Sequence, residues 1–462
     1  MRLRKHEISQ RVNGNLKIEF ANQDVSSYSG LELFRRYFRL INLNNRIRGA
    51  FKEYQFNGDY SVVDYILVFI ALWLTGGRRL RQVALISDDP LVKRLCGLNI
   101  LPSDRSISGW LKQFTNDSLQ ALVALNSEIV FEKLTELELP RITLDFDGTA
   151  LSCGNRVAWA FRGYNPHKRY SKSYYPLLCH VAQTGHFLQV RNRPGNTHDS
   201  KGGALNVIKS CVEQVRKELP DITIEVRVDA AFFTNEIISY LEREGIEFAV
   251  KVPMWSRLYL KDRIIFRQRW QHANKKLSWF KDKVYIENWN REVELIFFRN
   301  KISDSKPKSP FQLDLFSPDD GVYEYSVLCS NKNIRPENIL EFYNGRCSME
   351  HQIAEIKGEF GFDVVPTIHY GANSAHQQIS VLAYNLVRNF QVDTQITKDR
   401  KKTKKRTNIL SFQSLRTLRF EWITLAGRLL RPDGVKTLRL NSNPVIEQKF
   451  NQILDSLYKI AA

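Results

Sequence analysis

Two segments of this 462-residue chain alternate apolar and polar residues and then end on aspartates. The first, RITLDFDGT at 141–149, places Asp145 and Asp147 on one face of a predicted strand, because successive strand side chains point to opposite faces. The second, DITIEVRVDAAFF at 221–233, ends its alternation at Asp229. A period of two does not fit a helix, so the chain must build a sheet around these two strands.

The second strand begins a predicted βαβ unit. TNEIISYLEREG at 234–245 indicates a helix closed by Gly245, and IEFAVKVP at 246–253 indicates the next strand. A helical crossover joins parallel strands. Ligands of open α/β sheets bind beyond the carboxyl ends of such strands, which is where Asp229 falls.

Further strands are predicted at 174–182, 186–192 and 323–330, with a helix near 201–218. Between 255 and about 300, four tryptophans stand among β-forming and basic residues, which predicts a β-rich insertion. Core packing is the favoured role for these tryptophans, and stacking on a displaced base is the alternative.

These patterns divide the chain into five predicted parts. They are a helical N-terminal DNA-binding region at 1–138, the first part of an α/β core at 139–254, the β-rich insertion at 255–320, the second part of the core at 321–390, and a basic helical C-terminal region at 391–462 for DNA contact or dimerisation.

Two apolar stretches of the N-terminal region predict buried helices. The run at 65–74 is too short to span a bilayer. The segment at 102–114 offers Ser103 as an N-cap and places Ile107 and Trp110 on one face. That face is interpreted as core, with half of a helix-turn-helix as the alternative.

The formal charge of +19 is concentrated near the two ends of the chain. Residues 1–50 carry a net charge of +6 and residues 391–440 a net charge of +9. Such clustering fits a polyanionic partner, with a solvated loop as the alternative and an anionic membrane as a lesser one. The candidate DNA-binding residues of the C-terminal run are Lys401, Lys402, Lys404, Lys405 and Arg406.

Six scattered cysteines and a basic N-terminus without an apolar core after it indicate a cytoplasmic protein that is not inserted in a membrane.

A predicted helix at 341–360 carries a polar stripe beside an apolar one. The polar stripe consists of Tyr343, Arg346, Glu350 and Lys357, and the apolar stripe of Met349, Ile353, Ile356 and Phe360. This arrangement predicts a carboxylate at the rim of a core. Asn344 and Gly345 are a competing turn signal within the helix.

Asp147, Asp229 and Glu350 are the residue types that phosphodiester chemistry requires. Two divalent metal ions about 4 Å apart activate the attacking oxygen and stabilise the leaving one, and hard cations such as Mg²⁺ prefer carboxylate ligands. Other roles remain open, since the aspartates could be turn or cap residues and Glu350 could pair with Arg346. His198 with Asp199 invites a catalytic dyad, but Asp199 or Ser200 as a helix N-cap is the preferred interpretation.

The spacing Tyr343-x2-Arg346-x3-Glu350-x6-Lys357 resembles that of the DDE transposases of bacterial insertion sequences. Four fixed residues at fixed spacing arise by chance about once per 10⁵ positions. The resemblance extends over roughly residues 60–440. Its other matching segments are DGT at 147–149, RPGNTHDS at 193–200, DAAFF at 229–233 and VLAYNLVRNF at 381–390.

The resemblance implies an RNase H-like (retroviral-integrase-like) α/β core interrupted by a β-rich insertion. It implies that Asp147, Asp229 and Glu350 bind Mg²⁺ or Mn²⁺, two ions in all. Alternation alone leaves Asp145 and Asp147 as equal candidates for the first ligand, and the family's Asp-x-Thr pattern selects Asp147.

The same resemblance implies that Tyr343, Arg346 and Lys357 contact the DNA end. The expected partners are double-stranded DNA, as terminal inverted repeats and target, and a second copy of the chain in a paired-end complex. The expected location is the bacterial cytoplasm, in association with the nucleoid. The alternatives are a DNA-binding protein without catalysis and a metal-dependent nuclease without strand transfer.

Overall fold

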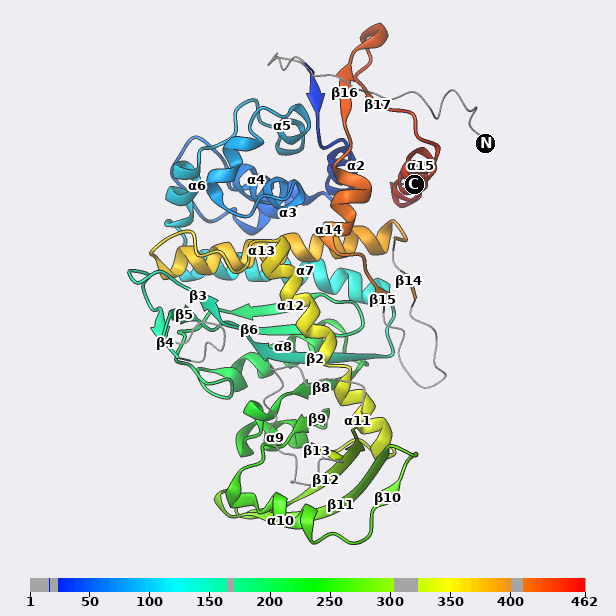
Figure 1. Ribbon diagram of the computed structural model, residues 1–462. Coiled ribbons are helices and arrows are strands. Elements are labelled where there is room, and N and C mark those ends of the chain that lie inside the picture. The colour runs from blue at the N-terminus through cyan, green and yellow to red at the C-terminus, as the bar shows by residue number, and fades with distance from the viewer. Residues whose placement is uncertain are drawn as a thin grey trace.

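The computed structural model describes residues 24–163, 170–302, 323–396, 398–399 and 410–461, together with residue 16. A nine-stranded sheet forms its middle and lower parts (Figure 1). In spatial order the strands are β10 (Gln271–His272), β11 (Leu277–Ile286), β12 (Arg291–Lys301), β13 (Tyr323–Ser330), β9 (Glu247–Lys251), β8 (Thr223–Val228), β2 (Arg141–Gly148), β6 (Leu177–Val181) and β7 (Phe187–Arg191).

The middle of the sheet is parallel. Strand β8 pairs in parallel with β2 and with β9, and α9 (Asn235–Arg243) connects β8 to β9. The predicted βαβ unit is therefore confirmed. All other pairs of this sheet are antiparallel, including β2 with β6 and β6 with β7.

Helices cover both faces of the parallel region. On one face, apolar side chains of β2 and β8 pack with α8 (Ala204–Glu218) and α9. The other face carries the polar side chains, and α11 (Pro336–Asn344) lies over it, followed by α12 (Cys347–Glu359) and α13 (Tyr370–Asp393). The polar face of β2 and β8 is thus covered by the segment that carries the Tyr-Arg-Glu-Lys spacing.

The insertion lengthens the same sheet. Strands β10, β11 and β12 confirm its β-rich character, and the short helix α10 (Leu260–Ile265) is an addition to the prediction. Phe280, Leu295 and Val327 belong to the same apolar cluster as β8 and α9. The tryptophans confirm the core prediction only in part, because Trp255 is 37% exposed and the other three are partly buried.

The N-terminal region is helical, as predicted. Its helices are α2 (Leu31–Leu40), α3 (Leu43–Ala50), α4 (Val62–Leu74), α5 (Pro90–Cys96), α6 (Asp104–Leu111) and α7 (Asn116–Glu136). Helix α4 is buried along most of its length, and α6 buries Ile107, Trp110 and Leu111, which confirms both core predictions. Ser103 accepts the backbone N–H of Ser106 as the predicted N-cap of α6.

Among the described residues, no helix is long and apolar enough to cross a membrane.

The C-terminal region differs from the predicted all-helical one. After α13 come β14 (Lys398–Asp399), β15 (Leu410–Ser411), α14 (Leu415–Leu418), β16 (Gly427–Leu430), β17 (Thr437–Leu440) and α15 (Pro444–Ala461). A Pro-Asp-Gly turn at 432–434 joins β16 to β17, and the positive φ of 51° at Asp433 and 81° at Gly434 excludes a continuous helix there.

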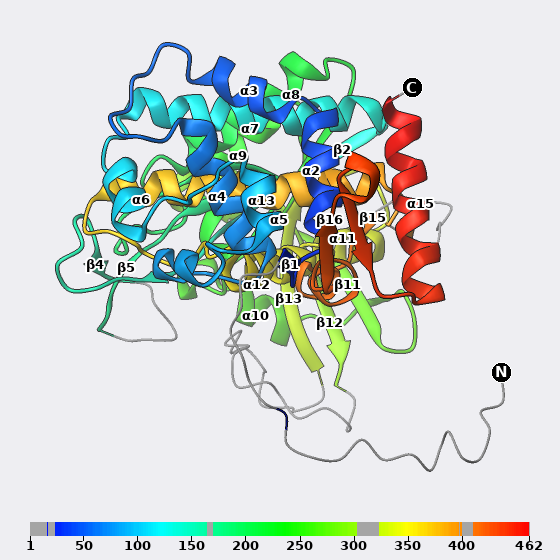
Figure 2. The same ribbon diagram turned by 90° about the horizontal axis from the view of Figure 1, so that it is seen from above.

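Segments from the two ends of the chain lie side by side. Strand β1 (Val25–Ser26) pairs with β16, and α2 packs against α15 (Figure 2). A second small sheet, β3 (Leu151–Ser152), β5 (Lys172–Tyr174) and β4 (Phe161–Arg162), follows β2 at the rim of the large sheet.

Candidate active site

The polar faces of β2 and β8 form a ladder of facing residues. The parallel register places Thr143 opposite Glu225 and Asp145 opposite Arg227. Thr143 Oγ1 donates to Glu225 Oε2 at 2.5 Å. Asp147 and Asp229 come next, at the carboxyl ends of the two strands.

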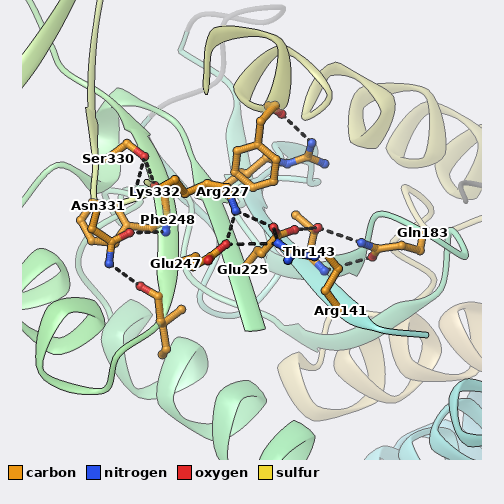
Figure 3. Close-up of polar contacts among 12 residues, drawn as sticks. Arg141, Thr143, Gln183, Glu225, Arg227, Glu247, Phe248, Ser330, Asn331 and Lys332 are labelled. Carbon is orange, nitrogen blue, oxygen red and sulfur yellow. Dashed lines mark hydrogen bonds and ion pairs between the residues drawn. The ribbon is translucent and has the colours of Figure 1, made fainter. Parts of the chain in front are cut away.

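The lower part of this ladder is a closed charge network (Figure 3). Glu225 accepts hydrogen bonds from Arg141 Nη1 and Lys332 Nζ, each at 2.5 Å, and Lys332 also pairs with Glu247. Burial alone would raise the pKa of Glu225, but Lys332, Thr143 and Arg141 lower it below its ordinary value. Because every charge here has a partner, we assign this network to stability rather than to chemistry.

Asp145 is neutralised within the fold. Its side chain is fully buried, and Arg227 Nε and Nη2 donate to its two oxygens at 2.7 Å each. Burial opposes the charge, but Arg227 and His180 keep the pKa of Asp145 below its ordinary value. Because the Asp145 carboxylate is fully buried and already paired with Arg227, the more exposed Asp147 is the candidate of the pair.

Asp147 lies in a different electrostatic environment. Its side chain keeps 18% of its exposure, and Arg346 Nη1 lies 3.1 Å from its Oδ2. Burial raises the pKa of Asp147 to about 7, because the opposing effect of Arg346 is outweighed when the nearby Asp229 and Asp199 carboxylates are added. A further positive charge close to Asp147 would therefore stabilise its ionised form.

Asp229 ends β8 and begins the short helix η2 (Ala230–Phe232). Its Oδ1 accepts the backbone N–H of Ala231 at 3.0 Å, and its side chain is half-buried. The N-cap role that the sequence offered as an alternative is therefore confirmed. Asp229 nevertheless lies close enough to Asp147 to raise the pKa of that carboxyl group.

Asp199 is a further acid that the sequence interpretation assigned differently. The predicted N-cap at Asp199 or Ser200 is wrong, since α8 begins later and its N-cap is Gly203, with φ of 80°. Tyr175 Oη donates to Asp199 Oδ2 at 3.0 Å, and Arg193 Nη2 lies 3.3 Å from Oδ1. Burial and the charge of Asp229 raise the pKa of Asp199 above its ordinary value. The sequence signal that could have identified Asp199 as a site residue is its position in the family-like segment RPGNTHDS.

Gly148 allows Asp199 and Tyr175 to approach the end of β2. A Cβ added at Gly148 would lie 2.1 Å from Asp199 Oδ1 and 2.3 Å from Tyr175 Cε1. We therefore expect Gly148→Ala to lower the free energy of unfolding by about 1–3 kcal/mol, because overpacking forces the neighbours to shift. Urea denaturation measures this loss. Gly154→Ala is the matched control, because its nearest neighbour would be Val157 Cγ2 at 3.8 Å; equal stability of the two variants would contradict the prediction.

The helix predicted at 341–360 is interrupted, so an unbroken helix is wrong and the competing turn signal at Asn344 and Gly345 is confirmed. Helix α11 ends at Asn344 and α12 begins at Cys347. Arg227 Nη1 donates to the carbonyl of Phe342 at 2.7 Å, which is the carbonyl that Arg346 N–H would reach in a regular helix. Arg346 N–H bonds Tyr343 O instead, and a Cβ on Gly345 would lie 2.3 Å from Arg227 Nη1.

Three members of the polar stripe stay close to the end of β2 despite the interruption, because Tyr343 interacts with Arg346, and both Arg346 and Lys357 lie in the field of Asp147. Arg346 is the N-cap of α12 and reaches Asp147, while Tyr343 is half-buried on α11 with its pKa raised to about 12, chiefly by desolvation. Lys357 Nζ donates to the carbonyl of Ala150 at 3.1 Å, just beyond β2. The apolar stripe is confirmed, since its four members are buried.

Glu350 lies exposed in the first turn of α12. Among the described residues, no three His, Cys, Asp or Glu side chains stand close enough to hold a metal ion. The structure thus brings Asp147, Asp229 and Arg346 together and leaves Glu350 outside that group. The candidate cations Lys401, Lys402, Lys404, Lys405 and Arg406 lie outside the described residues.

Comparison with known proteins places this geometry in a family. The model described as "Transposase DDE domain group 1" matches residues 8–462. The chain is similar to a piggyBac transposase in a synaptic complex with hairpin DNA, at 11% identity and a TM-score of 0.43 over 94% of this chain and 85% of that one. It is also similar to Mos1 transposase in a paired-end complex with the left transposon end, at 10% identity and a TM-score of 0.18 over 42% of this chain and 60% of that one.

The comparison with curated proteins found no match. The two structural similarities are too low to support an argument about detail, so the assignment rests on the family model. Because that model spans nearly the whole sequence, this chain belongs to the DDE transposase domain family.

Proposed function

We propose that the chain is the transposase of a bacterial insertion sequence. It binds the terminal inverted repeats of its element, cleaves the DNA ends and joins them to target DNA. The observation that carries the proposal is the meeting of Asp147, Asp229 and Arg346 at the carboxyl edge of β2 and β8, in a chain of the DDE transposase family.

We propose Asp147, Asp229 and Glu350 as the ligands of Mg²⁺ or Mn²⁺. Carboxylate oxygens suit such ions, and Asp147 has a pKa raised to about 7 by burial among like charges. Glu350 lies apart from Asp147 and Asp229 in this conformation and would have to move toward them to complete the set. When bound, two such ions supply activation of the attacking oxygen and stabilisation of the leaving one. Arg346, now paired with Asp147, and Lys357, in the field of the same carboxylate, provide positive charge at the site in this conformation.

The cationic side chains of the motif are proposed to hold the DNA end. Arg346 can grip a phosphate through two parallel hydrogen bonds, and Lys357 acts as a point charge beside β2. Tyr343 is proposed to contact the DNA end beside them. The basic run containing Lys401 and Arg406 is proposed to neutralise phosphates without reading sequence.

The architecture behind this proposal is an RNase H-like core with the five predicted parts. The strand order β7, β6, β2, β8, β9 supports it, with antiparallel strands on one side of β2 and parallel strands on the other. We further propose a homodimer in a paired-end complex, in the bacterial cytoplasm in association with the nucleoid.

Nicking of an oligonucleotide that carries the element's terminal repeats tests the proposal. Mn²⁺-dependent cleavage at the repeat, followed by joining of the product to a plasmid, is the expected result. Binding without cleavage would instead indicate a DNA-binding protein without catalysis. Cleavage without joining would indicate a metal-dependent nuclease.

Metal binding should depend on pH through Asp147. A proton and a metal ion compete for this carboxylate, whose pKa is about 7, so we expect Mn²⁺ affinity to fall about tenfold per pH unit below that value. Calorimetric titration from acidic to weakly basic pH measures the effect. Asp199→Asn should move the midpoint to lower pH, because it removes a neighbouring negative charge. An affinity that is constant across this range would contradict the assignment of Asp147 as a ligand.

A further inference from the structure

A basic groove lies at the end of the molecule formed by both chain ends. It has a volume of about 1370 Å³ and lies between α2 and α5 on one side and β16, β17 and α15 on the other. Figure 1 shows these elements at the top, above the sheet that carries Asp147 and Asp229. The groove is therefore separate from the candidate active site.

The charge of the groove is strongly one-sided. Eight arginine and lysine side chains line it against two carboxylates, Asp24 and Glu32. Glu32 is already neutralised, since it pairs with Arg35, Arg36 and Arg94. The basic excess that the sequence shows at 1–50 and 391–440 is thus partly gathered on one concave surface.

Several of these cations face solvent. Arg39 on α2, Arg428 on β16 and Arg431 after β16 are exposed, and none has a carboxylate partner among the described residues. Lys436, before β17, is also exposed. Their charges are free to neutralise an external anion.

The walls of the groove are tied to one another. Strand β1 pairs with β16 on one side, and Arg36 Nη1 donates to Tyr458 Oη at 3.0 Å, which joins α2 to α15. Leucines from all of its walls line the groove together with these polar groups. Arg39 and Arg428 therefore stand on regular elements, and Arg431 and Lys436 flank the turn that joins two paired strands.

The groove is also linked to the helix that carries Arg346 and Glu350. Arg419, on the π-helical turn before β16, pairs with Glu359 at the end of α12 at 2.8 Å. Leu415 N–H donates to Glu355 of the same helix at 2.8 Å. The segment that leads into β16, one wall of the groove, is thus in direct contact with α12.

We infer that this groove binds the phosphate backbone of double-stranded DNA away from the cleavage point. The inference rests on the proposed function and adds to it a surface that positions the DNA flank. The volume exceeds the range of about 300–1000 Å³ usual for small ligands, and several cations on fixed elements match a repeating anion. A planar membrane is a poorer fit, because these cations line a concavity rather than one face of an amphipathic helix.

The triple variant Arg39→Gln, Arg428→Gln, Arg431→Gln tests the inference. Fluorescence anisotropy with a labelled duplex, in chelator and over a range of salt concentrations, is the measurement. We expect the slope of log K against log salt to become shallower by about two to three, since each lost phosphate contact contributes about 0.9. Affinity should fall about tenfold or more for cognate and scrambled duplexes alike.

Arg216→Gln, Lys217→Gln, Arg243→Gln is the matched control, because it removes the same charge from exposed positions of α8 and α9 outside the groove. It should bind as the parent does. If the groove variant binds the duplex with the affinity and salt slope of the parent, the inference is overturned. It is also overturned if the groove variant loses binding to phosphatidylserine vesicles while it still binds the duplex. Unchanged melting temperatures establish that all variants are folded.

The nicking assay separates this inference from the proposed function. If the parent protein does not cut DNA, but the groove variant loses duplex binding, the proposed enzymatic activity is refuted and the DNA-binding role of the groove is supported. If the parent protein cuts and joins DNA, but the groove variant binds the duplex normally, the proposed enzymatic activity is supported and the DNA-binding role of the groove is refuted.

Discussion

Asp147→Asn is expected to reduce DNA cleavage by about a thousand-fold or more while the affinity for duplex DNA is retained. The amide keeps the shape of the carboxylate but loses its negative charge, so the site loses several kcal/mol of metal-assisted stabilisation, and each 1.36 kcal/mol is about tenfold in rate. DNA affinity should persist because it comes from the basic surfaces. Single-turnover nicking and anisotropy on the same preparations measure the two effects, and Asp229→Asn should behave in the same way.

Asp145→Asn is the matched control, two residues away on the same strand face. It should lower the melting temperature, because Arg227 would remain charged and buried beside a neutral amide. Asp147→Asn should not lower it. If Asp145→Asn instead abolishes cleavage at unchanged stability, and Asp147→Asn cuts normally, the first metal ligand is Asp145.

Arg227→Met is expected to lower the free energy of unfolding by about 3–5 kcal/mol, because it leaves the Asp145 carboxylate buried without its partner. It also removes the hydrogen bond to Phe342 O at the junction of α11 and α12. Urea denaturation measures the loss. Arg216→Met, at a pair with Glu244 whose arginine side chain is 42% exposed, should cost about 1 kcal/mol or less.

The double variant Arg227→Met, Asp145→Leu tests the cause. It removes both buried charges, so it should recover much of the stability lost in Arg227→Met. It should not recover cleavage, since the tie to Phe342 that sets the position of α12 remains absent. A double variant as unstable as Arg227→Met alone would show that packing of the arginine, rather than its charge, stabilises the sheet.

The strands that carry the site were predictable because their signal is local. Alternation located β2 and β8, and the crossover helix fixed β8 and β9 as parallel. The pairing of Asp145 with Arg227 was not predictable, because it depends on the register between β2 and β8, which local alternation does not give. Given that register, the same alternation would have matched the two charges.

The remaining misses have similar physical causes. The sequence signalled a turn at Asn344 and Gly345, but it could not show that Arg227, on β8, takes the carbonyl of Phe342 there. Asp199 meets Asp147 and Asp229 only after the chain has folded back from β7. The hairpin of β16 and β17, in contrast, was predictable, because the Pro-Asp-Gly sequence at 432–434 is a turn signal within the segment that was interpreted as helical.

The continuity of the large sheet determines how the insertion can move. Strand β13 pairs with β9 of the core on one edge and with β12 of the insertion on the other, so both parts belong to one sheet. A swinging lid needs a hinge of a few residues free of such bonds, and here the backbone ladder crosses that position. We therefore expect the insertion to move together with the strands that carry Asp147 and Asp229, and not as a lid over them.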